Sequence, residues 1–323
     1  MTVYGFGEVL LRYTPPHYEQ LKDASAFEVN VGGAEFNALV TLTQFGHSTE
    51  MLTVLPNHAM GQLALQRMYQ ARVGTQTLQL ANGRMGTYYM EESFGYRSGK
   101  VIYDRNHSTF AEQGESALKH LNADKGDYFL FTGITLSVNP SIRQQIVEVL
   151  TQLRQRGVKI VFDINFRSNL WTKEEALPVI QSILPLVDVL FFGKKDATHL
   201  LETNSVDDDM ETCAKTIQKQ YNIAFMASSN RDIDASTLQG IVLSGQDYFE
   251  GQVYAYTVLN RIGAGDAFMA GTLHGLLKGW SLTQTVDFAT KCSVMQHTTN
   301  EDALAVDERD VFQLATHFGE LNR

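Results

Sequence analysis

Short apolar runs alternate with helix-like segments through the middle of the chain. Four runs rich in Val, Ile, Leu and Phe have the length of buried strands; they span residues 128–131, 158–163, 187–192 and 223–226. Between the first two runs, apolar side chains recur on one helical face from Ile142 to Leu153. Asn139-Pro140 predicts the start of this helix, and Gly157 predicts its end. Strands that alternate with helices favour βαβ units around a parallel sheet, so we predict an α/β fold.

Two segments do not follow this alternation of strands and helices. Residues 12–28 and 86–110 are aromatic and alternate as strands do. We expect them to form a small β-sheet that lies over one end of the main sheet as a lid and shields the chemistry there from water. No repeat or flexible linker divides the chain, which predicts a single domain over residues 1–323 with the lid inserted in it.

Charge and cysteine content exclude several function classes. The chain has 26 basic and 36 acidic residues, a formal net charge of −10, and no local basic patch, so neither nucleic acid nor an anionic membrane is expected as a partner. Cys213 and Cys292 stand far apart and lack CxxC spacing, which disfavours a disulfide framework or thiolate zinc site. The N-terminus lacks a signal peptide, and no apolar run approaches the about 18 residues of a membrane span. We therefore expect a soluble, cytoplasmic protein.

The motif Gly263-Ala264-Gly265-Asp266 directly precedes an apolar run that predicts a buried helix over residues 267–277. N–H groups at a helix start are unpaired and carry the positive end of the helix dipole, so they bind phosphate where glycines allow close approach. Asp266 then stands where it can take a proton from an attacking hydroxyl. The helix start should also stabilise its ionised form and make it a weak base. The alternative is a tight turn in which Asp266 is an ordinary N-cap.

A second glycine motif, Gly32-Gly33, leads into a helix that ends near Gly46. Asn37 lies one turn into this helix, where Asn is unfavourable, which points to a functional side chain. The alternative is a plain strand-to-helix turn.

Polar residues follow two of the predicted strands, at the edge of a parallel sheet where ligands bind. Asp163, Asn165 and Arg167 would share one face if their strand continued, although a solvated strand end gives the same pattern. Lys194, Lys195 and Asp196 follow the next strand.

Other nucleotide and metal motifs are absent from the sequence. The segment 95–101 is one residue short of a P-loop and lacks its hydroxyl. Gly5-Phe6-Gly7 begins a dinucleotide fingerprint, but Leu10 occupies the third glycine position. The histidines, including His297, show no metal-ligand spacing.

Taken together, the Gly32-Gly33…Asn37 and Gly263-Ala264-Gly265-Asp266 motifs resemble those of the ribokinase-like, or PfkB, carbohydrate kinases. The order and spacing match over nearly the whole chain. The segments 7–12, 163–171 and His297-Thr298 look most like 2-keto-3-deoxygluconate kinases. This resemblance implies a three-layer sandwich with a β-sheet lid. It also implies ATP-dependent phosphorylation of a sugar acid at its terminal hydroxyl, giving 2-keto-3-deoxygluconate 6-phosphate, with Mg²⁺ on the ATP phosphates.

The resemblance also implies roles for individual residues. Asp266 would be the catalytic base, and the anion hole would be Gly263, Ala264 and Gly265. The sugar acid would contact Gly33, Asn37, Tyr89, Tyr103, Arg105, Arg167 and Asp302. ATP would contact Asn165, Lys195, Ser228, Gly263 and Gly265. No dedicated protein ligand for the metal is expected. Arg105 and Arg167 suit a carboxylate, because a guanidinium offers it a planar bidentate fork.

Two segments depart from the family pattern. Gly193-Lys194-Lys195-Asp196 stands where the family has Asn-x-x-Glu, and residues 226–231 replace its usual nucleotide loop. Lys194, Lys195 or Arg231 would then meet the phosphates instead. These departures leave two alternatives open, namely a fructokinase or other neutral-sugar kinase and a non-catalytic sugar-acid-binding regulator. Pairing of two copies through the lid, which would hide its strand edges, is also left open.

Overall fold

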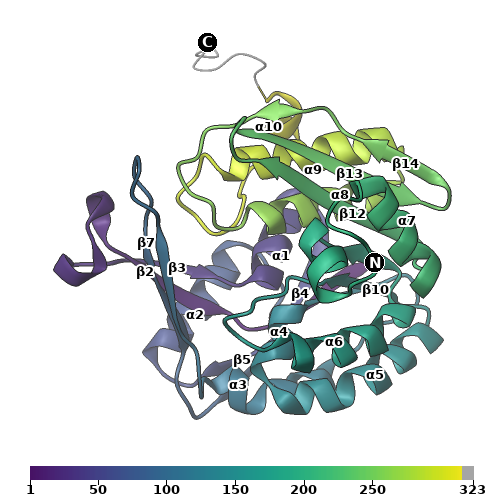
Figure 1. Cartoon of the computed structure of the whole chain (residues 1–323). Coiled ribbons are helices and arrows are strands. Elements are labelled where there is room, and N and C mark those ends of the chain that lie inside the picture. The colour runs from purple at the N-terminus through teal and green to yellow at the C-terminus, as the bar shows by residue number, and fades with distance from the viewer. Residues whose placement is uncertain (315–323) are drawn as a thin grey trace.

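A nine-stranded sheet forms the centre of the molecule (Figure 1). The computed structural model describes residues 1–314. The strand order is β14-β13-β12-β11-β10-β9-β1-β4, with β15 paired to β13. The six strands from β12 to β4 are parallel, and β13, β14 and β15 are antiparallel. Their bounds are β1 (Thr2–Phe6), β4 (Ser48–Leu52), β9 (Tyr128–Thr132), β10 (Lys159–Asp163), β11 (Val189–Phe191), β12 (Phe225–Asp232), β13 (Thr237–Ser244), β14 (Asp247–Glu250) and β15 (Tyr254–Ala255).

Helices cover both faces of this sheet because its strands are apolar on both sides. In β9, Phe129 and Phe131 enter one core, while Leu130 enters the other. The first core is closed by α4 (Gly133–Val138), α5 (Pro140–Gln155), α6 (Lys173–Ile183) and α7 (Met210–Tyr221). The second is closed by α1 (Ala34–Gln44), α2 (Ala59–Gln70), α8 (Ala264–Lys278) and α9 (Leu282–Gln296). The predicted three-layer α/β arrangement is confirmed.

The predicted elements have local physical causes. The Asn139 side chain accepts hydrogen bonds from the N–H groups of Ser141 and Ile142 and so caps α5, which ends just before Gly157 at φ 81°. The strand predicted at 223–226 is the longer β12, because its far half pairs with β13. The helix predicted at 267–277 begins three residues earlier, at Ala264. The other α-helices are α3 (Thr109–Gln113) and α10 (Glu308–Phe312), and β5 (Val54–Pro56) pairs with β6 (Gln79–Ala81).

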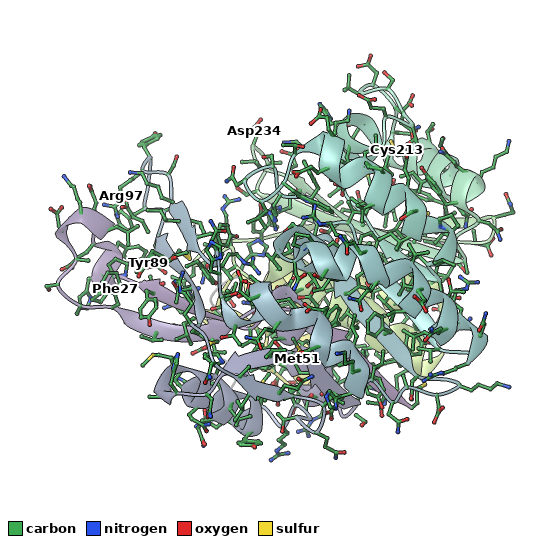
Figure 2. The ribbon with its side chains drawn as sticks, turned by 90° about the horizontal axis from the view of Figure 1, so that it is seen from below. Phe27, Met51, Tyr89, Arg97, Cys213 and Asp234 are labelled. Carbon is green, nitrogen blue, oxygen red and sulfur yellow. The ribbon has the colours of Figure 1, made fainter. Side chains whose placement is uncertain are left out.

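A separate four-stranded sheet, the lid, stands out from the main body (Figure 1). Its order is β3-β2-β7-β8, built from β2 (Leu10–Thr14), β3 (Glu28–Gly32), β7 (Gly86–Glu91) and β8 (Lys100–Asp104). The predicted segments 12–28 and 86–110 thus hold most of it, but β3 lies largely beyond the first segment, and residues 16–23 form short 3₁₀ turns instead of strand. Tyr13, Phe27 and Tyr89 pack together on its outer face, with Phe27 and Tyr89 labelled in Figure 2.

This architecture brings distant segments together at one edge of the main sheet. Parallel strands end there, and α1 and α8, which pack against each other, begin there. Ligands bind in open α/β sheets at such an edge. Within residues 1–314, no helix has both the length and the apolar character needed to cross a membrane.

Candidate active site

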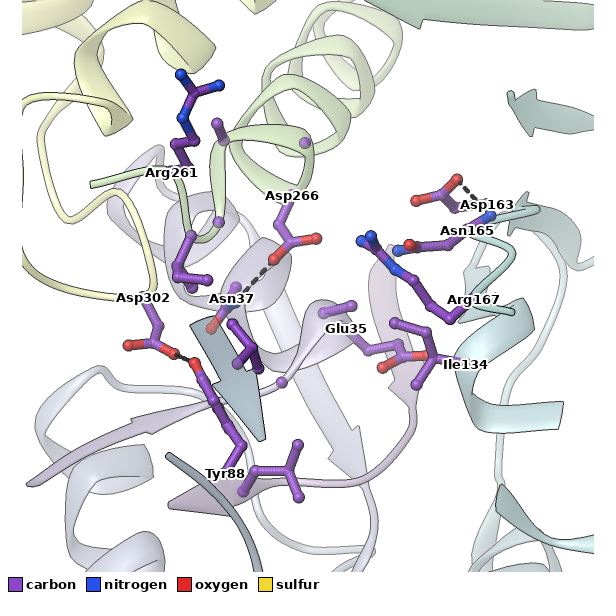
Figure 3. Close-up of a pocket in the computed structure, with 18 of the residues that line it drawn as sticks. Glu35, Asn37, Tyr88, Ile134, Asp163, Asn165, Arg167, Arg261, Asp266 and Asp302 are labelled. Atoms are coloured by element: carbon purple, nitrogen blue, oxygen red, sulfur yellow. Dashed lines mark hydrogen bonds between the residues drawn. The ribbon is translucent and has the colours of Figure 1, made fainter. Parts of the chain in front are cut away.

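A cavity of about 510 Å³ lies between the lid and the carboxyl ends of the parallel strands. The lid contributes Leu10, Tyr88, Val101 and Tyr103, and β12 contributes Ser229 and Arg231. Figure 3 shows Asp266 at its centre, with Tyr88 and Asp302 on one side in this view and Asp163, Asn165 and Arg167 on the other. The cavity therefore joins residues from the start, middle and end of the chain.

The start of α8 forms one wall of this cavity. Gly263 caps the helix with φ 76°, and a Cβ atom there would lie 1.8 Å from the backbone oxygen of Asp302. Only glycine suits this position, because both the backbone angle and the close contact exclude a side chain. A Cβ at Gly265 would meet nothing within 4 Å. Gly263, Ala264 and Gly265 all line the cavity, which therefore meets the positive end of the helix, as an anion site requires.

Asp266 lies in the first turn of α8, and a side chain from the first turn of α1 holds it. The Nδ2 group of Asn37 donates to Oδ2 of Asp266 at 2.7 Å (Figure 3). Burial raises the pKa of Asp266 to about 7, while the Asn37 hydrogen bond lowers it and the nearby Glu35 raises it further. The prediction of a well-ionised, weak base is wrong, because burial favours the neutral carboxyl group.

Two further carboxyl groups face the cavity beside Asp266. Strand β10 ends at Asp163, whose Oδ1 accepts the Asn165 N–H at 3.2 Å while Asn165 turns to φ 36°. This turn, and not a continued strand, brings Asn165 and Arg167 to the cavity. Oδ2 of Asp196 accepts the Gly193 N–H at 2.7 Å. Burial raises the pKa of Asp163 to about 8 and that of Asp196 to about 6, and the charge of Arg167 opposes both shifts.

The lid side of the cavity contains two buried ion pairs. Nε of Arg12 lies 3.2 Å from Oδ1 of Asp302, whose other oxygen accepts from the Tyr88 hydroxyl. Nε of Arg105 donates to Oε2 of Glu8 at 2.8 Å. The charges of Asp302 and Arg105 are therefore balanced within the protein. Arg167, by contrast, has no ion-pair partner within the described residues.

Most of the sequence-predicted site residues meet in this cavity. Those that line it are Gly33, Asn37, Tyr103, Arg105, Asn165, Arg167, Gly263, Ala264, Gly265, Asp266 and Asp302. Three do not line it. Tyr89 points to the outer face of the lid because neighbours along a strand alternate, and Tyr88 takes the inner position. Lys195 is exposed away from the cavity, and Ser228 is buried beside Ser229, which does line it.

Sequence reasoning missed Tyr88, Glu8 and Glu35 as cavity residues. A signal for Tyr88 exists, because it is the cross-strand partner of Tyr103 and such partners share a face, but the pairing register is visible only in the structure. Glu35 is buried with Oε1 held by the Thr132 N–H and the Thr135 hydroxyl, and burial raises its pKa.

Comparison with known proteins shows which family the chain belongs to. Residues 3–308 match the sequence pattern of the pfkB family of carbohydrate kinases. The chain belongs to this family. As a PfkB carbohydrate kinase, it transfers a phosphoryl group to a carbohydrate.

Several named PfkB proteins resemble the chain over nearly its full length. A 2-dehydro-3-deoxygalactonokinase from Haloferax volcanii is 26% identical over 306 residues, covering 95% of this chain and 94% of that protein. The structure of 2-dehydro-3-deoxygluconokinase from Thermotoga maritima superimposes with a TM-score of 0.90 at 28% identity, covering 98% of each chain. A PfkB family carbohydrate kinase from Listeria grayi gives a TM-score of 0.90 at 30% identity, covering 98% of this chain and 100% of that one. The predicted ribokinase-like fold is confirmed.

The two glycines of the anion hole should respond differently to alanine. Gly265→Ala places a methyl group in open space, so the fold is kept while the phosphate is displaced, and kinase activity should fall about 100-fold or more. Gly263→Ala forces a contact and an unfavourable φ, and should lower the free energy of unfolding by about 1–3 kcal/mol. A coupled kinase assay measures the activity of the Gly265→Ala enzyme, and urea unfolding measures the stability of the Gly263→Ala protein. A Gly265→Ala enzyme with full activity would contradict the assigned anion hole.

The raised pKa of Asp266 predicts pH-dependent activity. As the predicted catalytic base, Asp266 must be deprotonated, so kcat/KM should fall with decreasing pH below a midpoint of about 7. Asn37→Leu removes a bond that favours the charged form, and the midpoint should move upward. Gln44→Ala, on the exposed face of the same helix, is the control and should leave it unchanged. A wild-type midpoint near the ordinary pKa of an aspartic acid would contradict the raised pKa of Asp266.

Proposed function

We propose that this PfkB kinase transfers the terminal phosphoryl group of ATP to 2-keto-3-deoxygluconate, giving the 6-phosphate. One observation carries the proposal: Asp266 faces a cavity that has an anion-binding helix start on one wall and the unpaired Arg167 on another. Similarity to a 2-dehydro-3-deoxygluconokinase over 98% of the chain supports this substrate class.

In the proposed reaction, the terminal hydroxyl of the sugar acid attacks the γ-phosphorus of ATP. A bond forms between these atoms, the bond to the leaving ADP oxygen breaks, and the hydroxyl proton passes to Asp266. The N–H groups of Gly263, Ala264 and Gly265 stabilise the charge on the transferred group. Asn37 holds Asp266 in line with the hydroxyl. Because the transition state is loose, this alignment matters more than early removal of the proton.

The sugar-acid carboxylate is assigned to Arg167. Glu8 already pairs with Arg105, whereas Arg167 lines the cavity without an ion-pair partner in the described part of the chain. Arg105, Tyr103, Gly33 and Asp302 then remain for the hydroxyl and keto oxygens of the substrate.

The nucleotide is assigned to the part of the cavity beside the start of α8. Asn165, Ser229, Arg231 and Arg261 line the same cavity as Gly263 and Gly265. Arg231 and Arg261 have no ion-pair partner within residues 1–314 and suit the polyphosphate charge. Arg231 was predicted from the sequence to meet the phosphates, and Arg261 and Ser229 take the place of Lys195 and Ser228.

Mg²⁺ fits two carboxylates that line the same cavity. Asp163 and Asp196 offer the hard oxygen donors that Mg²⁺ prefers. In the described part of the chain, no group of three or more His, Cys, Asp or Glu side chains could hold a metal alone. The ion would be shared with the ATP phosphates, where it would neutralise developing charge.

The chain is proposed to act as one cytoplasmic domain, with residues 315–323 outside the described part. Cys213 and Cys292 are both free and buried, which suits a reducing compartment.

A substrate panel tests this function. With ATP and Mg²⁺, we expect phosphorylation of 2-keto-3-deoxygluconate and little of fructose. Arg167→Leu should lower kcat/KM for the acid about 10- to 100-fold through loss of a charged hydrogen-bond partner. Arg156→Leu, an exposed change at the far end of α5, should have no effect. Faster turnover of fructose would favour the neutral-sugar kinase, and acid binding without transfer would favour the regulator.

We further propose that two copies pair through the lid. Strand β8 is the outer strand of the lid sheet, and all five of its residues are exposed, including Ile102. An open strand edge with apolar side chains favours pairing with another strand. Sedimentation at micromolar concentration should show a dimer, and Ile102→Lys should yield monomers, because a charge would then face the partner strand. Leu80→Lys, at another exposed apolar site, is the control. A monomeric wild-type protein would refute the pairing.

A further inference from the structure

Glu8 occupies an unusual position in the cavity. It follows β1, at the edge of the main sheet, and precedes β2, which enters the lid. Its side chain is 2% exposed although the residue lines the cavity. A carboxylate with so little access to water requires partners for both oxygens. Glu8 has them: Oε2 accepts from Arg105, and Oε1 accepts from the Ser108 hydroxyl.

The Arg105 guanidinium is bound to Glu8 along one edge. Its Nε and Nη2 donate to the same oxygen, at 2.8 and 2.5 Å. This uses two of its five N–H groups and fixes the plane of the guanidinium. The residue is 5% exposed, and it lines the cavity. The remaining N–H groups have no protein acceptor among the described residues, and they are left for a ligand.

Two glycines make room for Glu8. A Cβ atom at Gly86 would lie 2.2 Å from its Oε1, and one at Gly33 would lie 2.4 Å from its backbone oxygen. Gly86 belongs to the lid, and Gly33 precedes α1. Two separate segments of the chain thus leave space for Glu8, Gly86 for its carboxylate and Gly33 for its backbone.

We propose that Glu8 is a positioning residue for substrate recognition, which acts by holding Arg105 with its free N–H groups turned toward the sugar acid. This rests on the proposed function. Glu8 itself does not touch the reacting atoms. Because the pair carries no net charge, Arg105 supplies directed hydrogen bonds, while Arg167 supplies the charge.

A double-mutant cycle tests this inference. Glu8→Ala should raise KM for 2-keto-3-deoxygluconate about 10- to 100-fold and leave kcat and the KM for ATP within about threefold, as expected for loss of a charged hydrogen bond to substrate. Arg105→Ala should give a similar rise. In the Arg105→Ala background, Glu8→Ala should have no further effect, because its target is gone.

A milder variant keeps the test possible if Glu8→Ala does not fold. In Glu8→Gln, the amide oxygen can accept from Arg105 while the amide N–H donates to Ser108, so KM should rise less than in Glu8→Ala. If Glu8→Ala does not fold, the cycle is run with Glu8→Gln. Glu91→Gln is the matched control: it is a buried lid glutamate that accepts from the Leu21 N–H at 3.0 Å and lies outside the cavity lining. It should leave KM unchanged.

Three outcomes would overturn the inference. These are an equal KM rise in Glu91→Gln, a second full rise when Glu8 is changed in the Arg105→Ala background, and a fall in kcat at unchanged KM. Failure of the proposed function looks different, since the wild-type enzyme would then not phosphorylate 2-keto-3-deoxygluconate. The cycle would in that case be run with the sugar that the enzyme does phosphorylate.

Discussion

The hydrogen bond between Asn37 and Asp266 joins the starts of two helices that are 229 residues apart in sequence. Helix α1 follows the lid strand β3, and the start of α8 is the proposed anion site. Their packing along one face of the sheet brings these starts together. The bond then fixes the acidic side chain relative to the proposed sites of the sugar acid and of the phosphate. The separation between the reacting groups therefore depends on how two helices pack.

The lid is joined to this arrangement by buried charges. Arg12 of β2 forms an ion pair with Asp302, and Arg105, just after β8, forms one with Glu8. A buried ion pair contributes little net stability, but breaking it leaves an uncompensated charge, so it holds one geometry strongly. These pairs and the apolar contacts of Leu11 and Val31 with the core give the lid sheet a defined position over the cavity. Gly263, in contact with the backbone of Asp302, links the same region to the anion site.

The sequence was sufficient for the fold class and for most of the cavity, because these depend on local signals. Apolar periodicity identified the buried strands, and glycines with an adjacent carboxylate identified the start of α8. The errors concern properties that depend on distant neighbours. The choice between Tyr88 and Tyr89 depends on strand register, and the pKa of Asp266 depends on how far folding removes it from water. The neutralisation of Arg105 by Glu8 joins residues 97 positions apart, and no local pattern reveals it.

Three carboxyl groups at one cavity, those of Asp163, Asp196 and Asp266, have pKa values of about 8, 6 and 7. Near pH 7 the ligand-free enzyme therefore holds protons on Asp163 and in part on Asp266, while Asp196 is mostly ionised. Any cation that arrives with the nucleotide favours their ionised forms and expels protons into solution. Nucleotide affinity is then thermodynamically linked to the acidity of the medium, and the heat of binding depends on the ionisation enthalpy of the buffer.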